Sequence, residues 1–236
     1  MSDLTVLYIT ACRTPPRWRQ FHLEHLKKAT NDLPVLASAP EPVPIGWYSH
    51  QEGPHSYGTI YREMLRLSRL ADTRYVAMAE DDVLYTRTHF TEFRPPMDAV
   101  AYDRSRWSLY TWNPVFHLKN RLSNAALIAP REYLIDALEE RERKYPDGVP
   151  EDRIGEVGRM RIDRRLRVQP RKCVEFWGRE PIVHLHHPSG CDIGDAPGWR
   201  KTYGQVQAFE IPYWGHARDI VAKYKEPGWV STAASD

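Results

Sequence analysis

The chain has 236 residues, of which 42% are hydrophobic and 27% charged, which is ordinary for a soluble globular protein with a substantial core. No apolar run approaches the roughly 20 residues of a membrane span, and we expect neither a signal peptide nor a membrane-spanning segment. The formal net charge of +2 is weak support for a polyanionic partner. Cys12, Cys173 and Cys191 are odd in number and far apart, which argues against a disulfide framework and favours a reducing cytoplasm.

The first part of the chain alternates predicted strands with predicted helices. Residues 4–10 are apolar and β-branched and predict a first strand. Thr14 is expected to cap the next helix, with the following prolines in its first turn. A second strand is predicted over residues 33–38, and the apolar side chains from Tyr57 to Leu67 recur at helical spacing. This order of elements favours an α/β fold.

A predicted buried strand runs directly into three carboxylates. Residues 75–79 are uncharged, Glu80, Asp81 and Asp82 follow, and Val83 resumes an apolar stretch. Such a run is typical of a parallel sheet, and open α/β sheets place their ligands at the carboxyl ends of their strands. Three adjacent acids repel one another, and a divalent cation relieves that repulsion because it prefers hard oxygen ligands. The alternative is a solvated acidic turn that binds nothing.

The residues around these acids resemble the metal-site segment of GT-A-type glycosyltransferases, which use nucleotide-sugar donors. The residues that carry the resemblance are Glu80-Asp81-Asp82-Val83-Leu84-Tyr85, Thr88-His89-Phe90 and Phe93-Arg94-Pro95-Pro96. They are most similar to a family-two-like branch of bacteria and phages, and the resemblance covers most of the chain from Thr5 to about Gly190. It implies a GT-A-like, Rossmann-like α/β fold with a central, mostly parallel sheet flanked by helices. It also implies the cytoplasm of a bacterium or of a phage-infected host.

The resemblance divides the chain into functional parts. We expect one glycosyltransferase domain over residues 1–236, with the nucleotide-sugar donor half in 1–100 and the acceptor and catalytic half in 101–190. Residues 191–236 would form a C-terminal lid or strap. It would contain a helix carrying Tyr213, Ala217, Ile220, Val221 and Tyr224.

The donor-binding candidates come from three predicted loops and helix starts. The loop after the first strand is a usual nucleotide-contact point in α/β folds. The resemblance implies that this loop contacts the base and ribose of the donor, which makes Thr10 and Arg13 candidates. The resemblance adds Arg62, near the start of the second helix. It also implies that Glu80 or Asp81 binds ribose hydroxyls or orients metal-bound water. A plain surface role is the alternative for the arginines.

The acceptor and catalytic candidates follow the acidic stretch. Strands are predicted over residues 107–112 and 125–129, and the resemblance implies that Trp107, Trp112 and Asn124 line the acceptor pocket. Core packing explains the tryptophans equally well. Glu151 and Asp152 open a predicted helix carrying Ile154 and Val157, and the resemblance makes Asp152 the catalytic base of an inverting enzyme. The alternative for this acidic pair is a helix N-cap without chemistry.

Strands are predicted over residues 174–177 and 181–185, and a histidine cluster, His184, His186 and His187, lies at the end of the second. Strand alternation places His184 and His186 on one face and His187 on the other. The resemblance implies that a late histidine binds the metal together with Asp82. His187 has the best position for this role and His186 is the reserve. The cation would be Mn²⁺ or Mg²⁺, and its ligand shell would be completed by water and donor phosphates.

Three functional hypotheses remain open at this point. The leading one is a metal-dependent glycosyltransferase that moves a sugar from a nucleotide-diphosphate sugar, in particular a UDP-sugar, to a hydroxyl acceptor. Its acceptor is a hydroxymethylpyrimidine in phage DNA or, alternatively, a saccharide or a protein. The second is a zinc hydrolase built on the histidine cluster with Cys191 or Asp192. The third is a noncatalytic nucleic-acid-binding module.

The DNA hypotheses depend on a run of basic side chains, with only Asp163 among them. The run consists of Arg159, Arg161, Arg164, Arg165, Arg167, Arg171 and Lys172. Such a run would hold a phosphate backbone, or it is a solvated helix face. The oligomeric state is not indicated by the sequence.

Overall fold

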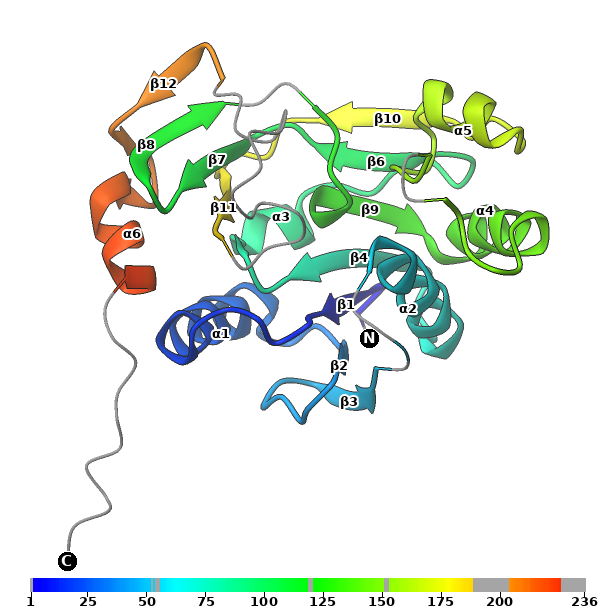
Figure 1. Cartoon of the computed structure of the whole chain (residues 1–236), viewed down its shortest axis with the longest axis horizontal. Coiled ribbons are helices and arrows are strands. Elements are labelled where there is room, and N and C mark those ends of the chain that lie inside the picture. Colours follow the sequence, from blue (N-terminus) through cyan, green and yellow to red (C-terminus); the bar gives the residue numbers. More distant parts are fainter. Residues whose placement is uncertain are drawn as a thin grey trace, which may run out of the picture.

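The structure of the protein is a computed structural model that describes residues 2–51, 53, 56–118, 121–150, 153–188 and 204–225. Two sheets organise these residues, and the helices lie around them (Figure 1). Among the described residues, none of the helices has both the length and the apolar composition needed to cross a bilayer.

The central sheet has seven strands in the order β10-β6-β9-β4-β1-β2-β3. In chain order they are β1 (Leu4–Ile9), β2 (Val35–Ala39), β3 (Trp47–His50), β4 (Tyr75–Glu80), β6 (Val100–Asp103), β9 (Leu127–Pro130) and β10 (Cys173–Phe176). Only β9 runs antiparallel to its neighbours β4 and β6, and the other pairings are parallel. The predicted fold class, an α/β protein with a central, mostly parallel sheet, is confirmed.

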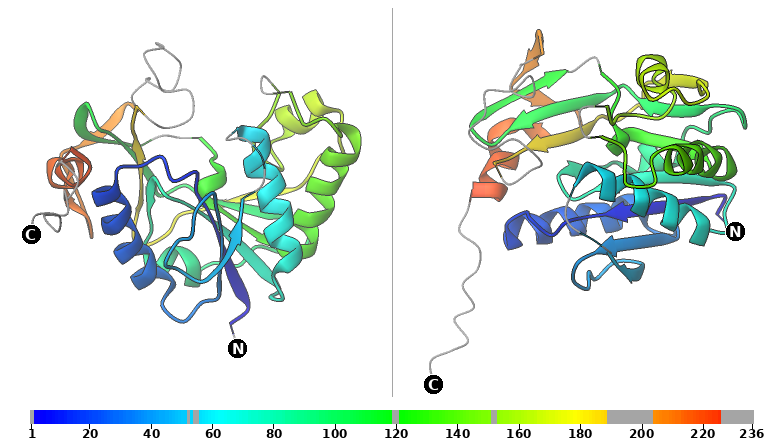
Figure 2. Two further views of the ribbon diagram at one scale, coloured as in Figure 1. Left: turned by 60° about the horizontal axis from the view of Figure 1, so that its bottom comes forward. Right: turned by 45° about the vertical axis from the view of Figure 1, so that its right-hand side comes forward.

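Helices cover both faces of this sheet. The α-helices of the described residues are α1 (Pro16–Thr30), α2 (Tyr57–Leu70), α3 (Arg87–Thr91), α4 (Arg131–Lys144), α5 (Met160–Leu166) and α6 (Ala217–Lys225), of which α6 packs elsewhere. One core cluster joins Val6 and Tyr8 of β1 to Leu23 and Leu26 of α1, and a second joins Leu7 of the same strand to α2 and α4. Figure 2 shows α1 on one side of the sheet and the α2–α4 pair on the other. Burial on both faces explains why β1 and β4 are almost wholly apolar.

A second sheet, which the sequence did not predict as a separate layer, has five strands in the order β12-β8-β7-β11-β5. Its strands are β5 (Val83–Leu84), β7 (Arg106–Tyr110), β8 (Asn113–Leu118), β11 (Ile182–His186) and β12 (Val206–Ala208), and a small hairpin pairs β13 (Glu210–Ile211) with β14 (Gly215–His216). Helix α6 packs on this sheet in a core cluster that includes Trp18 of α1. The chain enters the second sheet immediately after the acidic residues, so these residues lie where the two sheets meet.

Three local predictions were wrong. Thr14 does not cap α1, because the N-cap is Pro15 and the Thr14 hydroxyl donates to Asp81 instead. Ile154 and Val157 are not helical, since α5 begins only at Met160. Tyr213 lies before α6, in a left-handed conformation with φ of 72°. In the first case a tertiary hydrogen bond replaces the local one, and in the others the helix starts later than the apolar pattern suggests.

Candidate active site at the junction of the two sheets

The acidic residues mark the end of β4, the middle strand of the central sheet. Glu80 is the last residue of β4 and pairs with Ile9 of β1. The chain turns through Asp81 and Asp82 into β5, which pairs antiparallel with β11 so that Val83 lies opposite His184. The Leu185 backbone N–H donates to the Asp82 carbonyl at 2.7 Å and secures this turn. The three acids therefore lie at the carboxyl end of a parallel strand, where α/β folds bind ligands.

Asp81 faces the loop that follows β1. Its Oδ2 accepts hydrogen bonds from the hydroxyls of Thr10 at 2.7 Å and Thr14 at 3.1 Å, and its carbonyl accepts from the Trp18 indole N–H at 2.8 Å. Burial and the neighbouring Asp82 raise the pKa of Asp81 to about 6, although the two hydroxyls oppose that rise. The structure thus brings together Thr10 and Asp81, two of the residues predicted to bind the donor.

Glu80 is the most strongly perturbed of the three acids. Burial and the charges of Asp82 and Asp81 raise its pKa to about 8, while Arg106 acts in the opposite direction. Its backbone N–H donates to the Tyr85 hydroxyl at 3.0 Å, and that hydroxyl donates to the Ala125 carbonyl at 2.9 Å. Neither contact neutralises the carboxylate. The protein itself therefore leaves Glu80 in a position that a positive charge would stabilise.

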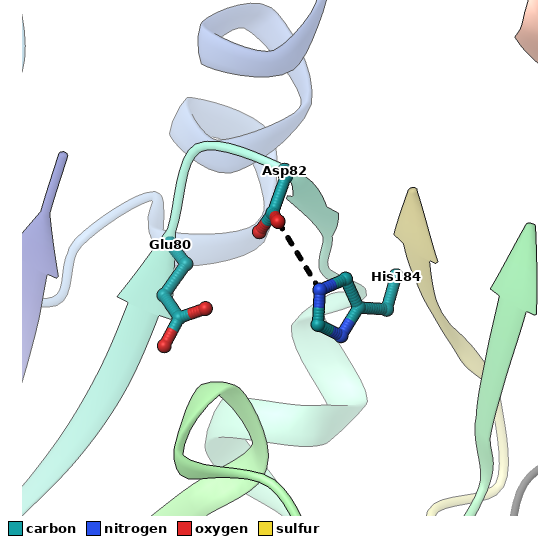
Figure 3. Close-up of side chains that lie close together, drawn as sticks. All are labelled: Glu80, Asp82 and His184. Atoms are coloured by element: carbon teal, nitrogen blue, oxygen red, sulfur yellow. Dashed lines mark hydrogen bonds and ion pairs between the residues drawn. The ribbon is translucent and has the colours of Figure 1, made fainter. Parts of the chain in front are cut away.

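Asp82 pairs with a histidine of the second sheet. Its Oδ2 lies 3.1 Å from His184 Nε2, whereas its buried Oδ1 has no hydrogen-bond partner among the described residues. Burial raises the pKa of Asp82, but His184, His187 and His22 together outweigh that effect, and the net shift is downward. Figure 3 shows Glu80 and Asp82 approaching the same space as His184. One candidate ligand atom from each of these three residues lies within 4.8 Å of the others, and no other such group occurs in the described part of the chain.

The other two histidines of the cluster have different surroundings. His186 Nε2 lies 3.0 Å from the Ser108 hydroxyl, and its ring stacks on those of His184 and Tyr110. His187 is buried against the Tyr224 ring, and its Nδ1 has no hydrogen-bond partner within the described ranges. Burial lowers the pKa of His187 although Asp82 raises it, so this imidazole lies within the field of the acidic turn.

The arginines predicted to bind the donor lie in two places. Arg13 is exposed in the loop after β1, and its charge contributes to the lowered pKa of His187. It therefore lies on the same side of the molecule as the acidic turn. Arg62 is exposed on α2, where it lines a small pocket between α2 and α4 together with Tyr61, Leu138 and Arg141.

The acceptor candidates also differ from one another. Trp107 is partly buried and packs in the core of the second sheet, in edge contact with Phe116. Trp112 is 39% exposed, just beyond the end of β7. Asn124 donates from Nδ2 to the Tyr61 hydroxyl at 2.6 Å, and its buried Oδ1 has no partner in the part of the chain that the structure describes. Asp152, the predicted base, lies outside the described residues, as do Cys191 and Asp192.

Sequence reasoning missed two residues of the site, His184 as the partner of Asp82 and Arg106. Arg106 is buried, donates from Nη1 to His184 Nδ1 at 3.0 Å and from Nη2 to the Arg121 carbonyl at 3.3 Å. Strand alternation indicated the face on which His184 lies. The antiparallel pairing of β5 with β11, which brings that face to Asp82, has no signal in a single sequence.

In the comparisons with known proteins, this chain matches only solved structures of low sequence identity. No protein-family model matches the sequence, and the search of curated proteins gives no match. A 2-C-methyl-D-erythritol 4-phosphate cytidylyltransferase from Thermus thermophilus has a TM-score of 0.48 and 13% identity, over 79% of this chain and 94% of that chain. A mannosyltransferase from Pyrobaculum calidifontis, in complex with GDP-Man and Mn²⁺, has a TM-score of 0.43 and 13% identity, over 78% of this chain and 56% of that chain.

A third structure is a Drosophila galactosyltransferase 7 mutant in complex with manganese, UDP-Gal and xylobiose. It has a TM-score of 0.42 and 11% identity, over 87% of this chain and 76% of that chain. The neighbours are thus nucleotidyl- and glycosyltransferases at low identity. Function is therefore inferred from the side chains of the site.

Proposed function

We propose that the protein is a metal-dependent glycosyltransferase that uses a nucleotide-diphosphate sugar. The observation that carries this proposal is the pair of carboxylates, Glu80 and Asp82, at the carboxyl end of β4, with Asp82 Oδ1 buried and without a partner among the described residues. A solvated acidic turn would not raise the pKa of Glu80 to about 8, as burial and its acidic neighbours do here.

The residues present fit a hard divalent cation. Glu80 and Asp82 would hold it through carboxylate oxygens, which Mn²⁺ and Mg²⁺ prefer. His187, whose buried Nδ1 has no partner within the described ranges, is the imidazole that we propose for the same ion, with His186 as the reserve. When bound, the cation supplies charge neutralisation for a departing nucleoside diphosphate.

The remaining candidate residues would bind either the donor or the acceptor. Thr10, Arg13 and Asp81 would contact the nucleoside part of the donor, and Arg62 would approach it from α2. Trp107, Trp112 and Asn124 would line the acceptor pocket. Asp152 would accept the proton of the acceptor hydroxyl if the reaction inverts configuration, a role worth about 100- to 10,000-fold in rate.

The acceptor that we propose is a hydroxymethylpyrimidine in DNA, with a saccharide or protein hydroxyl as the alternative and a UDP-sugar as donor. The only acid among the basic residues of α5, Asp163, is buried and bound to Arg141 at 2.9 Å. Arg161, Arg164 and Arg167 are exposed, so the outer face of α5 is basic and suits a phosphate backbone.

The test begins with a thermal-shift screen of nucleotide-diphosphate sugars with and without Mn²⁺, since a ligand of the folded state raises its Tm. Each donor that binds is then incubated with hydroxymethylated DNA and with glycan acceptors, and the products are analysed by mass. Release of nucleoside diphosphate with added sugar mass supports a glycosyltransferase. Release of pyrophosphate with formation of a nucleotide sugar would show a nucleotidyltransferase instead. Sugar transfer only to glycans would remove the DNA acceptor.

A further inference from the structure

His184 is held at both ring nitrogens and on one ring face. Its Nε2 lies 3.1 Å from Asp82 Oδ2, and its Nδ1 lies 3.0 Å from Arg106 Nη1. Its ring stacks on His186 with a centroid distance of 4.4 Å and an interplanar angle of 20°. His186 in turn stacks on Tyr110. The ring therefore has a single orientation that its surroundings determine.

The hydrogen-bond directions follow from the chemistry of arginine. A guanidinium has five N–H donors and no acceptor, so His184 Nδ1 must accept from Arg106. The neutral ring then carries its proton on Nε2, which donates to Asp82 Oδ2. Arg106 is buried on β7 and also donates to the Arg121 carbonyl, which fixes its own position.

This arrangement is unsuited to a direct bond between His184 and a cation. To offer a lone pair from Nε2, the ring would have to move its proton to Nδ1, where it would face the Arg106 N–H. Two donors would then oppose each other in a buried site, which is unfavourable. The Nε2–H bond to Asp82 instead leaves Asp82 Oδ1 as the oxygen without a partner among the described residues.

We infer that His184 is not a ligand but a positioning residue, which holds the Asp82 carboxylate with Oδ1 directed to the cation and is itself held by Arg106. This inference rests on the proposed function, since it presupposes a cation at Asp82. Residues that orient ligands in this way commonly change metal affinity by about 10- to 100-fold when they are replaced.

The experiment compares two substitutions of His184. His184→Gln keeps an N–H donor that can reach Asp82 but has no imidazole lone pair, whereas His184→Leu has neither. Mn²⁺ affinity is measured by titration with electron paramagnetic resonance, with His216→Gln as a control because His216 is exposed and pairs with Glu210. We expect affinity to fall about 10- to 100-fold in His184→Leu and to be largely retained in His184→Gln. Equal losses in both variants would show that the imidazole itself binds the metal.

A spectroscopic measurement tests whether His184 binds the metal without relying on a change in affinity. Electron spin echo modulation of bound Mn²⁺, with histidine labelled by ¹⁵N, reports nitrogen atoms in its first coordination shell. We expect the modulation, whatever its intensity in the wild type, to be unchanged in His184→Gln. A nitrogen signal that disappears in that variant overturns the inference while leaving the glycosyltransferase proposal intact.

If the wild-type protein binds no Mn²⁺ with any donor, the proposed function fails, and the hydrogen-bond arrangement is still testable. Proton–nitrogen correlation spectra of the metal-free protein with labelled histidine distinguish the two tautomers. We expect His184 to be protonated at Nε2 and unprotonated at Nδ1. A proton on Nδ1 would show that Arg106 does not hold the ring as inferred.

Discussion

Two aspartate–histidine pairs of this molecule differ in whether the second oxygen of the carboxylate has a hydrogen-bond partner. Asp103 Oδ2 lies 2.9 Å from His89 Nδ1, and both side chains are fully buried. Asp103 Oδ1 accepts from the Ser105 N–H at 2.8 Å, the Ser105 hydroxyl at 2.6 Å and the Gly178 N–H at 3.3 Å. Asp82 has a similar bond to His184 at 3.1 Å, but its Oδ1 has no partner in the described part of the chain.

The difference separates a structural pair from a candidate functional one. Asp103, the last residue of β6, is bonded by His89 of α3, by Ser105 in the turn before β7 and by Gly178 after β10. It therefore ties these elements together and has no oxygen left for a ligand. Asp82 is half-buried beside two further carboxylates. A carboxylate oxygen without a donor is costly in a buried place, and its retention is explained when a ligand supplies the missing positive charge.

The largest effect is expected from Asp82→Asn. The substitution keeps the size of the side chain and removes the charge that would bind the cation. We expect glycosyl transfer to fall by about a thousandfold or more, since a metal contributes several kcal/mol to transition-state stabilisation. Thermal unfolding should show an intact fold. Full activity of Asp82→Asn at saturating Mn²⁺ would exclude Asp82 as a ligand.

The same change in the other pair, Asp103→Asn, should act on stability and not on chemistry. Removing one member of a buried pair costs about 3–5 kcal/mol. For a chain of this length that corresponds to a fall in Tm on the order of 10 °C. Mn²⁺ affinity of the folded protein, measured well below the new Tm, should be unchanged. A large loss of affinity without a loss of stability would reverse the roles assigned to the two pairs.

A smaller effect is expected from removing one hydroxyl beside each set of acids. Thr10→Val removes the donor to Asp81, and Ser105→Ala removes a donor to Asp103. Each bond to a carboxylate is worth about 1.5–3 kcal/mol, so denaturant unfolding should show similar losses of stability. Only Thr10→Val should also raise the KM for the nucleotide sugar. An equal rise of KM in Ser105→Ala would mean that the loss is a general consequence of destabilisation.

Much of the central sheet was predictable because its strands carry local signals. The uncharged run before Glu80 and the β-branched run from Leu4 are patterns typical of a buried strand, and both strands occur as expected. The second sheet was not predictable in the same way. Its strand β5 has two residues, and its pairing with β11 joins positions about a hundred residues apart.

The part of the candidate site that lies on the central sheet was predictable, and the part on the second sheet was not. Glu80, Asp81 and Asp82 come directly after a strong strand pattern, so their position at the carboxyl end of a buried strand could be predicted from the sequence. His184 and Arg106 depend on the register of β11 with β5 and β7, which no local pattern encodes. Thr14 failed as a cap for a related reason, because the Asp81 carboxylate from another loop binds its hydroxyl.

The last effect, that of Glu80→Gln, depends on pH. The pKa of Glu80 rises from its ordinary value of 4.5 to about 8 in the folded protein, because burial and the neighbouring aspartates disfavour its charge. The folded state then binds a proton that the unfolded state has released, so the free energy of unfolding of the metal-free protein falls as pH rises through this window. Because Gln cannot ionise, the Glu80→Gln variant does not lose this stability as pH rises.

We therefore expect metal-free Glu80→Gln to match the wild type near pH 4.5 and to exceed its Tm at pH 8.5. Each pK unit by which the fold raises the pKa of Glu80 is worth about 1.4 kcal/mol, or about 3–6 °C for a chain of this length. Added Mn²⁺ should reverse the order at pH 8.5, since the cation stabilises only a site that keeps the Glu80 carboxylate. Asp103 shows the opposite sign: its pKa is lowered in the fold, so its contribution is lost only in acid. A Tm difference between wild type and Glu80→Gln that is independent of pH would show that Glu80 is not held in a charge-repelling site.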